Sequence, residues 1–156
     1  MNRCPGCGLE STGGAAGCQS RFHELTARDF SDYRYGRFHR MAVDTYCVQH
    51  PEQYCVSAKS LVAHLGGLYC AFEQGADPEI YRALQRLLNG KPALEKPALP
   101  SSRGEVTIAD VLSAPDPDSY GREVKRWARS VWDAHAPVHP FVRRWLQDAM
   151  EKQSLR

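Results

Sequence analysis

Apolar residues recur at helical spacing along most of the chain beyond residue 19. In the stretch 57–74 they lie three and four positions apart, with Ser57 placed as an N-cap and Gly75 after the last repeat. Residues 78–88 continue the pattern after Asp77, with proline at the first helical position. The pattern predicts two helices that each bury one face. The positions expected to point inward are Leu61, Val62, Leu65, Leu68 and Phe72, followed by Ile80, Leu84, Leu87 and Leu88.

Helices are also predicted before this pair. Phe22, Leu25 and Phe30 fit a short first helix. Asp32 is placed to cap a second helix, which we expect to run to about Gln49. No strand-like alternation of any length appears in the chain, so the pattern favours helices alone.

The C-terminal third contains a long predicted loop and one interrupted helix. Residues 91–105 are rich in Pro, Ser and Gly and predict a loop, after which Thr107 is placed to cap a short helical turn. The last helix should begin near Asp118 and be interrupted at Pro137 and Pro140. Its apolar face, expected in the core, carries Val124, Trp127, Ala128, Val131, Trp132, Val142, Trp145 and Leu146.

These elements predict an all-α fold. We expect one domain over residues 1–156, with a Cys-rich segment at 1–18 and a bundle of four to five main helices at 19–156. The length of 156 residues and the 42% hydrophobic content suit one domain with its own core.

The Cys-rich segment is the most specific chemical feature. Cys4-Pro-Gly-Cys7 is a Cys-x2-Cys turn followed by glycine, and Cys18 offers a third thiolate. Tetrahedral Zn²⁺ prefers four nitrogen or sulfur ligands in such turns. The segment has too few apolar side chains to fold by burial, so metal binding is the expected source of its order. The sequence therefore predicts a zinc site.

The fourth ligand stays open at this point. His23 is nearest in sequence and would complete Cys-x2-Cys-x10-Cys-x4-His, while His50 at the end of the second helix competes and His39 ranks third. Two alternatives are a mobile tail with reduced cysteines and a redox pair at Cys4 and Cys7. A redox Cys-x-x-Cys usually follows a strand, and none is predicted here.

The remaining cysteines and histidines fit either core or ligand roles. Cys47 and Cys70 fall inside predicted helices and are typical of buried core thiols. His64 lies on an apolar helical face, where a hydrogen-bonded core histidine is an ordinary occupant. His135 and His139 lie four residues apart, the spacing at which two imidazoles can face one metal, although the nearby prolines disturb that geometry.

Two resemblances follow from these motifs. The opening Cys-Pro-Gly-Cys-Gly, the run from Phe38 to Pro51, the run from Ser57 to Leu65 and the Trp-rich C-terminal helix resemble a family of small bacterial proteins of unknown function. This resemblance spans nearly the whole chain and implies no activity.

A second resemblance concerns the histidines. The His-Leu dipeptide at His64 and the His-x3-His at His135 and His139 resemble the DinB/YfiT-like four-helix bundles. That resemblance implies a divalent metal held by these three histidines, and a metal-dependent thiol transferase or hydrolase as the alternative function. In that case Asp44 or His39 would orient a ligand or act as a general base; otherwise Asp44 would anchor Arg40 or Lys59 in the interior.

Charge and hydropathy restrict the remaining function classes. The net charge of +2 is spread along the chain, which argues against a nucleic-acid partner. No apolar run reaches the length of a membrane span, and residues 1–5 begin no signal-peptide core. We therefore expect a cytoplasmic protein, in which reduced cysteines favour Zn²⁺ over disulfides. Its partner, either a protein or a small molecule, is not specified, and a homodimer stays open, as does catalysis.

Overall fold

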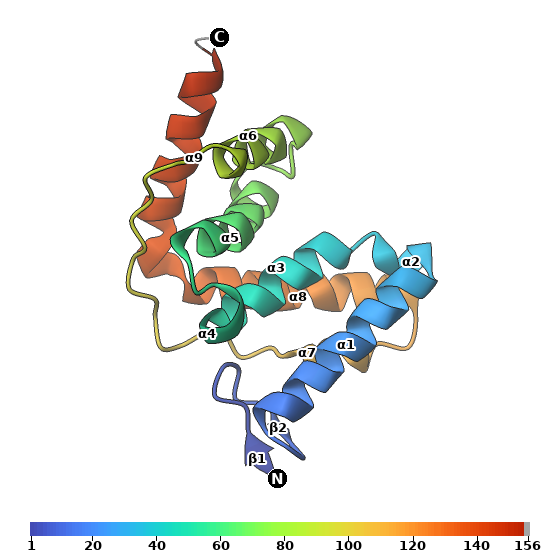
Figure 1. The fold of residues 1–156 in the computed structure, drawn as a ribbon. Coiled ribbons are helices and arrows are strands. Elements are labelled where there is room, and N and C mark those ends of the chain that lie inside the picture. The colour runs from blue at the N-terminus through green and yellow to red at the C-terminus, as the bar shows by residue number, and fades with distance from the viewer. Residues whose placement is uncertain (155–156) are drawn as a thin grey trace.

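The computed structural model describes residues 1–154, and most of them are helical (Figure 1). Two strands of two residues each, β1 (Asn2–Arg3) and β2 (Glu10–Ser11), pair antiparallel at the N-terminus. The helices that follow are α1 (Ala15–Ser31), α2 (Tyr33–Gly36), α3 (His39–Gln49), α4 (Pro51–Tyr54), α5 (Ala58–Glu73), α6 (Pro78–Asn89), α7 (Ile108–Leu112), α8 (Pro117–Ala134), the 3-10 helix η1 (Ala136–Val138) and α9 (His139–Ser154). The all-helical prediction is confirmed.

Polar caps place several helix starts where the sequence predicted them. The side chain of Ser57 accepts a hydrogen bond from the backbone N–H of Ser60, and Asp77 accepts one from the N–H of Glu79. Each bond satisfies a backbone donor that has no partner within the helix. The last helix begins at Pro117, with Asp116 as its cap, one residue before the predicted start.

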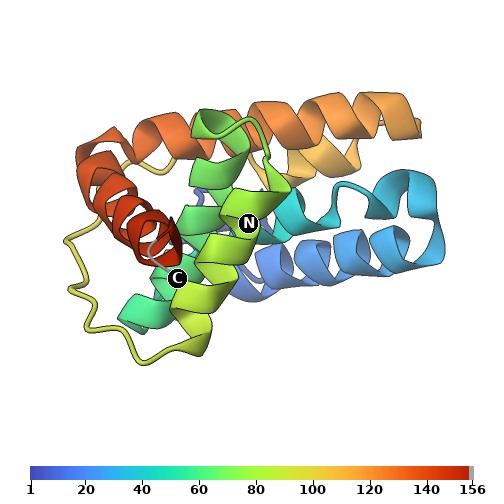
Figure 2. The ribbon, with the colours of Figure 1, turned by 90° about the horizontal axis from the view of Figure 1, so that it is seen from above.

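The core lies among α3, α5 and α8. Helix α3 packs against both α5 and α8, α5 packs against α6, and α6 packs against α9. Viewed from above, α8 and α9 meet at an angle through η1, where the prolines interrupt the helix as predicted (Figure 2). Trp127, Trp132 and Trp145 are all buried, which confirms their core assignment.

The long loop after α6 is fixed to the end of α3. The Gln49 amide donates hydrogen bonds to the carbonyls of Arg103, at 3.2 Å, and Val106, at 2.9 Å, and its oxygen accepts one from the Trp127 indole at 2.9 Å. Arg103 also pairs with Glu52. These bonds hold the C-terminal end of α3 in place, next to His50.

Four features differ from the predicted pattern. The expected helix from Asp32 to Gln49 is split into α2 and α3, because the chain turns between Gly36 and His39. A Cβ at Gly36 would lie 2.4 Å from the Asp29 carbonyl, so the close approach of this turn to α1 requires glycine. Helix α1 begins at Ala15, so Cys18 belongs to the helix and not to a separate leader. Phe30, one of the apolar residues of the predicted first helix, is 79% exposed, and the short strand pair was not predicted.

Within residues 1–154, no helix combines the length and the apolar character that a membrane span requires.

Candidate metal centre

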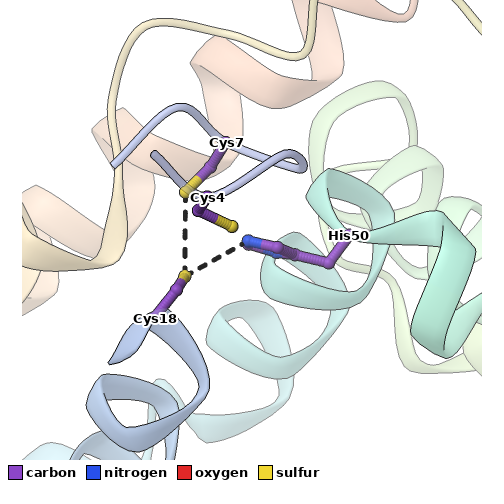
Figure 3. A group of neighbouring side chains, drawn as sticks. All are labelled: Cys4, Cys7, Cys18 and His50. Carbon is purple, nitrogen blue, oxygen red and sulfur yellow. Dashed lines mark hydrogen bonds between the residues drawn. The ribbon is translucent and has the colours of Figure 1, made fainter. Parts of the chain in front are cut away.

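Four side chains from three separate parts of the chain meet beside the N-terminal strand pair (Figure 3). They are Cys4 and Cys7 from the turn between β1 and β2, Cys18 from the first turn of α1, and His50 from the end of α3. One potential ligand atom from each lies within 4.8 Å of all the others. Among the described residues this is the one group of three or more such ligands. Cys4, Cys18 and His50 are buried, and Cys7 is half-buried.

The Cys4–Cys7 turn is held by backbone hydrogen bonds and by glycines. The N–H of Cys4 donates to the Leu9 carbonyl and the N–H of Gly8 donates to the Cys4 carbonyl, each at 2.8 Å. Gly8 has a φ of +79°, a backbone conformation that residues other than glycine rarely adopt. A Cβ at Gly6 would lie 2.5 Å from Cδ2 of His50, so glycine is needed for the turn to approach the imidazole.

Cys18 reaches the group because the strand pair leads directly into α1. A Cβ at Gly17 would lie 2.4 Å from both Oγ of Ser11 and the carbonyl of Thr12. The absence of a side chain there lets the start of α1 pack against β2. The glycine-rich composition of the segment therefore serves close packing around the sulfur atoms.

His50 is held in one orientation. Its Nδ1–H donates to the carbonyl of Tyr46, one helical turn earlier, at 2.8 Å. The other ring nitrogen, Nε2, then carries the lone pair and faces the sulfur of Cys18 at 3.4 Å. A hydrogen bond of this kind commonly fixes the tautomer of a metal-ligating histidine.

Two of the separations between ligand atoms match the edges of a tetrahedral centre. With Zn–S near 2.3 Å and Zn–N near 2.05 Å, the edges of a tetrahedron are about 3.8 Å for sulfur to sulfur and about 3.5 Å for sulfur to nitrogen. The structure has 3.7 Å between the sulfurs of Cys7 and Cys18, and 3.4 Å between Cys18 and Nε2 of His50. A donor set of three thiols and one imidazole, all converging, therefore fits a zinc-sized cation.

The electrostatics of the group favour the thiolate form at Cys18 and disfavour it at Cys7. The hydrogen bond from Cys7 and, less strongly, that from Tyr46 lower the pKa of Cys18 although burial opposes them. The hydrogen bond with Cys18 and then burial raise the pKa of Cys7, so the two sulfurs share a proton when only protein atoms are present. A divalent cation would relieve this competition because it stabilises both thiolates.

The other predicted ligands lie elsewhere. His23 is exposed on α1 and does not join the group. Of the histidines considered as the fourth ligand, His50 is the one that lies beside the three cysteines. His39 donates from Nδ1 to the buried carboxylate of Asp29 at 2.9 Å, and Asp29 also accepts a 2.6 Å bond from the Tyr120 hydroxyl. These contacts join α1, α3 and α8.

The three-histidine centre that the DinB-like resemblance implied is not assembled in the described chain. His64 on α5 donates from Nδ1 to Asp44 at 2.9 Å. His135 donates from Nδ1 to the Val131 carbonyl at 2.7 Å, and His139 donates from Nε2 to the Trp132 carbonyl at 2.8 Å. Each histidine is thus engaged with its own partner, as core histidines are.

Asp44 takes the buried-anchor role, with His64 as its main partner. Its second oxygen lies 3.8 Å from Nε of Arg40, one helical turn away. Burial raises the pKa of Asp44, and the contact with His64 opposes that rise. Burial disfavours the charge on His64 as well, but Asp44 and then the Cys47 thiol outweigh it and raise the pKa of His64 to about 9.

The fold and the site together define a small helical protein with a buried three-cysteine, one-histidine cluster of the kind that holds a metal ion. The chain belongs to DUF5946, a family of unknown function, whose model matches residues 2–136 and so includes all four clustered side chains. No curated protein and no solved structure matches the chain.

Proposed function

We propose that the protein binds one Zn²⁺ through Cys4, Cys7, Cys18 and His50, and that this zinc is structural. The observation that carries the proposal is the convergence of all four ligand atoms within 4.8 Å of one another, with the Cys7–Cys18 and Cys18–His50 separations suited to the edges of a tetrahedron. Three thiolates and one imidazole are a typical donor set of structural zinc sites, in which the protein fills every coordination position.

A structural role follows from what the centre joins. The strand pair, α1 and α3 supply its ligands, and the first of these has little core of its own. Zinc bound there would attach residues 2–11 to the helices, much as a disulfide would in an oxidising compartment. All six cysteines are free thiols in the structure, which suits a reducing compartment such as the cytoplasm.

The same closed geometry argues against a catalytic zinc, because such sites keep a position for water or substrate. We therefore propose that the protein acts through a surface that contacts a protein or small-molecule partner, and that the zinc maintains the fold which presents that surface.

Chelation tests the structural role. The zinc-loaded full chain is compared with the same protein after treatment with a strong chelator, by hydrogen exchange resolved along the sequence. We expect residues 2–18 to lose protection while α5, α6 and α9 keep theirs, because only the former depend on the ligand sulfurs. Equal protection of residues 2–18 before and after complete removal of zinc would contradict the proposal.

A further inference from the structure

Tyr46 contacts two of the four ligands at once. Its backbone carbonyl accepts the Nδ1–H of His50 at 2.8 Å, and its hydroxyl lies 3.3 Å from the sulfur of Cys18. Its ring also stacks on the imidazole, with 3.9 Å between ring centroids and 22° between planes. One side chain therefore connects the ligand from α1 with the ligand from α3.

The hydroxyl of Tyr46 is not explained by packing alone. The ring stacks on Phe22 with centroids 4.1 Å apart, and it makes edge-to-face contacts with Tyr54 and Trp127. A phenylalanine would make the same ring contacts without placing a polar atom in a position that is 0% exposed. Burying a hydroxyl is costly unless it finds a hydrogen-bond partner. The Cys18 sulfur is the partner that residues 1–154 offer it.

The charge of a loaded centre explains why a donor is needed there. Three thiolates and one Zn²⁺ leave a net charge of −1 in a largely buried position, and hydrogen bonds to sulfur disperse such charge. The sulfur of Cys7 accepts a hydrogen bond from the backbone N–H of Leu9. For Cys18, which is fully buried, the corresponding donor from outside the ligand set is the Tyr46 hydroxyl.

We propose that Tyr46 is a positioning residue of the metal centre: its hydroxyl donates to the Cys18 thiolate and its carbonyl fixes the orientation of His50, so that it sets the zinc affinity and the electron density on that sulfur. This inference rests on the proposed function, because it requires a metal at the four ligands. It adds a residue that does not itself bind the ion.

The test is Tyr46→Phe in the full chain, which removes the hydroxyl and keeps the ring and the carbonyl. Zinc affinity is measured by competition with a chromophoric chelator. Loss of a partner of this type typically weakens metal binding about 10- to 100-fold, and we expect a loss within that range. In the Co²⁺-substituted protein the sulfur-to-cobalt charge-transfer band should move to longer wavelength, because a thiolate without its donor gives up an electron more easily.

Tyr54→Phe is the matched control. The Tyr54 hydroxyl accepts a 3.0 Å hydrogen bond from the Gln19 amide, and its ring belongs to the same aromatic group as Tyr46. It contacts no ligand sulfur through its hydroxyl. We expect its zinc affinity and its cobalt band to equal those of the wild type, although its stability can fall as a result of the lost hydrogen bond.

A second variant keeps the proposal testable if Tyr46→Phe does not fold. Site-specific replacement of Tyr46 by 3,5-difluorotyrosine retains the hydroxyl and makes it a stronger donor, so the cobalt band should move to shorter wavelength. The inference would be overturned if folded Tyr46→Phe had wild-type zinc affinity and an unshifted cobalt band, or if the fluorinated protein had an unshifted band. Neither result would contradict zinc binding by the four ligands. A wild-type protein that binds no zinc would overturn the proposed function itself.

Discussion

Gly67→Ala should destabilise the protein although alanine is the better helix former. Gly67 lies inside α5, and a Cβ there would be 2.0 Å from Oδ2 of Asp44. An ordinary contact between carbon and oxygen is more than an ångström longer. Asp44 cannot turn away, because it is buried and its other oxygen is bound to His64 at 2.9 Å. Either α3 and α5 separate or the carboxylate loses His64.

The size of the effect can be bounded. Breaking a buried charged pair destabilises a folded protein by about 3–5 kcal/mol, whereas replacing glycine by alanine within a helix stabilises it by about 1 kcal/mol. We therefore expect the free energy of unfolding of Gly67→Ala to fall by about 2–4 kcal/mol. Urea denaturation followed by circular dichroism on the zinc-loaded protein measures this difference.

Gly66→Ala is the control for the helix itself. A Cβ at Gly66 would lie 2.9 Å from Cδ1 of Leu84, the end of a flexible side chain that can shift. Its unfolding free energy should stay within about 1 kcal/mol of the wild type. A Gly67→Ala protein as stable as Gly66→Ala would refute the reasoning about the Asp44–His64 pair.

Three further predictions follow from the centre and from this pair. The pKa of His64 is raised from 6.5 to about 9, so its pairing with Asp44 contributes fully to the stability of the fold below pH 6.5, and this contribution is lost as the pH rises through 9. In urea unfolding curves, His64→Gln should therefore destabilise the protein at pH 6.5 and have little effect above pH 9. His50→Ala removes a ligand and should weaken zinc binding by more than about 100-fold, the largest loss typical for a residue that only hydrogen-bonds a ligand. His23 is exposed, so His23→Ala should bind zinc like the wild type in the same chelator competition. Gly6→Ala should weaken zinc binding on the order of tenfold, because its Cβ would displace the His50 ring, and unchanged affinity would show that the turn can move away.

Helix positions were predictable where a local signal marked them. Ser57 and Asp77 cap α5 and α6 as expected, because an N-cap bond involves residues two or three apart and needs no knowledge of the fold. The break between α2 and α3 was not predictable in this way. It depends on Gly36 packing against Asp29, a contact between two helices that the chain pattern does not encode.

The sequence predicted the three thiols of the candidate metal centre and left its histidine open among His23, His50 and His39. Cys4 and Cys7 lie in one turn, and Cys18 follows Cys7 at a sequence separation of 11. His23 is the nearest histidine to Cys18 in the sequence, five residues after it, but α1 begins at Ala15 and contains both residues. Residues five apart on a helix point in different directions, so Cys18 is buried while His23 is exposed.

His50 joins the three cysteines from a distant part of the chain, and Tyr46 lies beside it. Their spacing of four residues places the Tyr46 carbonyl beside the His50 ring, a local signal that the sequence does contain. That this pair faces Cys18 depends on how α3 packs against α1 and α8, which only the structure shows. The same packing leaves His64, His135 and His139 with separate partners.

The most direct test of the account is the zinc content of the intact chain by native mass spectrometry after reconstitution with Zn²⁺. Wild type and Cys70→Ser should each carry one zinc per chain, and Cys18→Ser should carry none. Cys70 is the matched control because it is as fully buried as Cys18 and lies outside the cluster. A wild-type chain without zinc, or a Cys18→Ser chain that retains a full equivalent, would contradict the assignment of the metal centre.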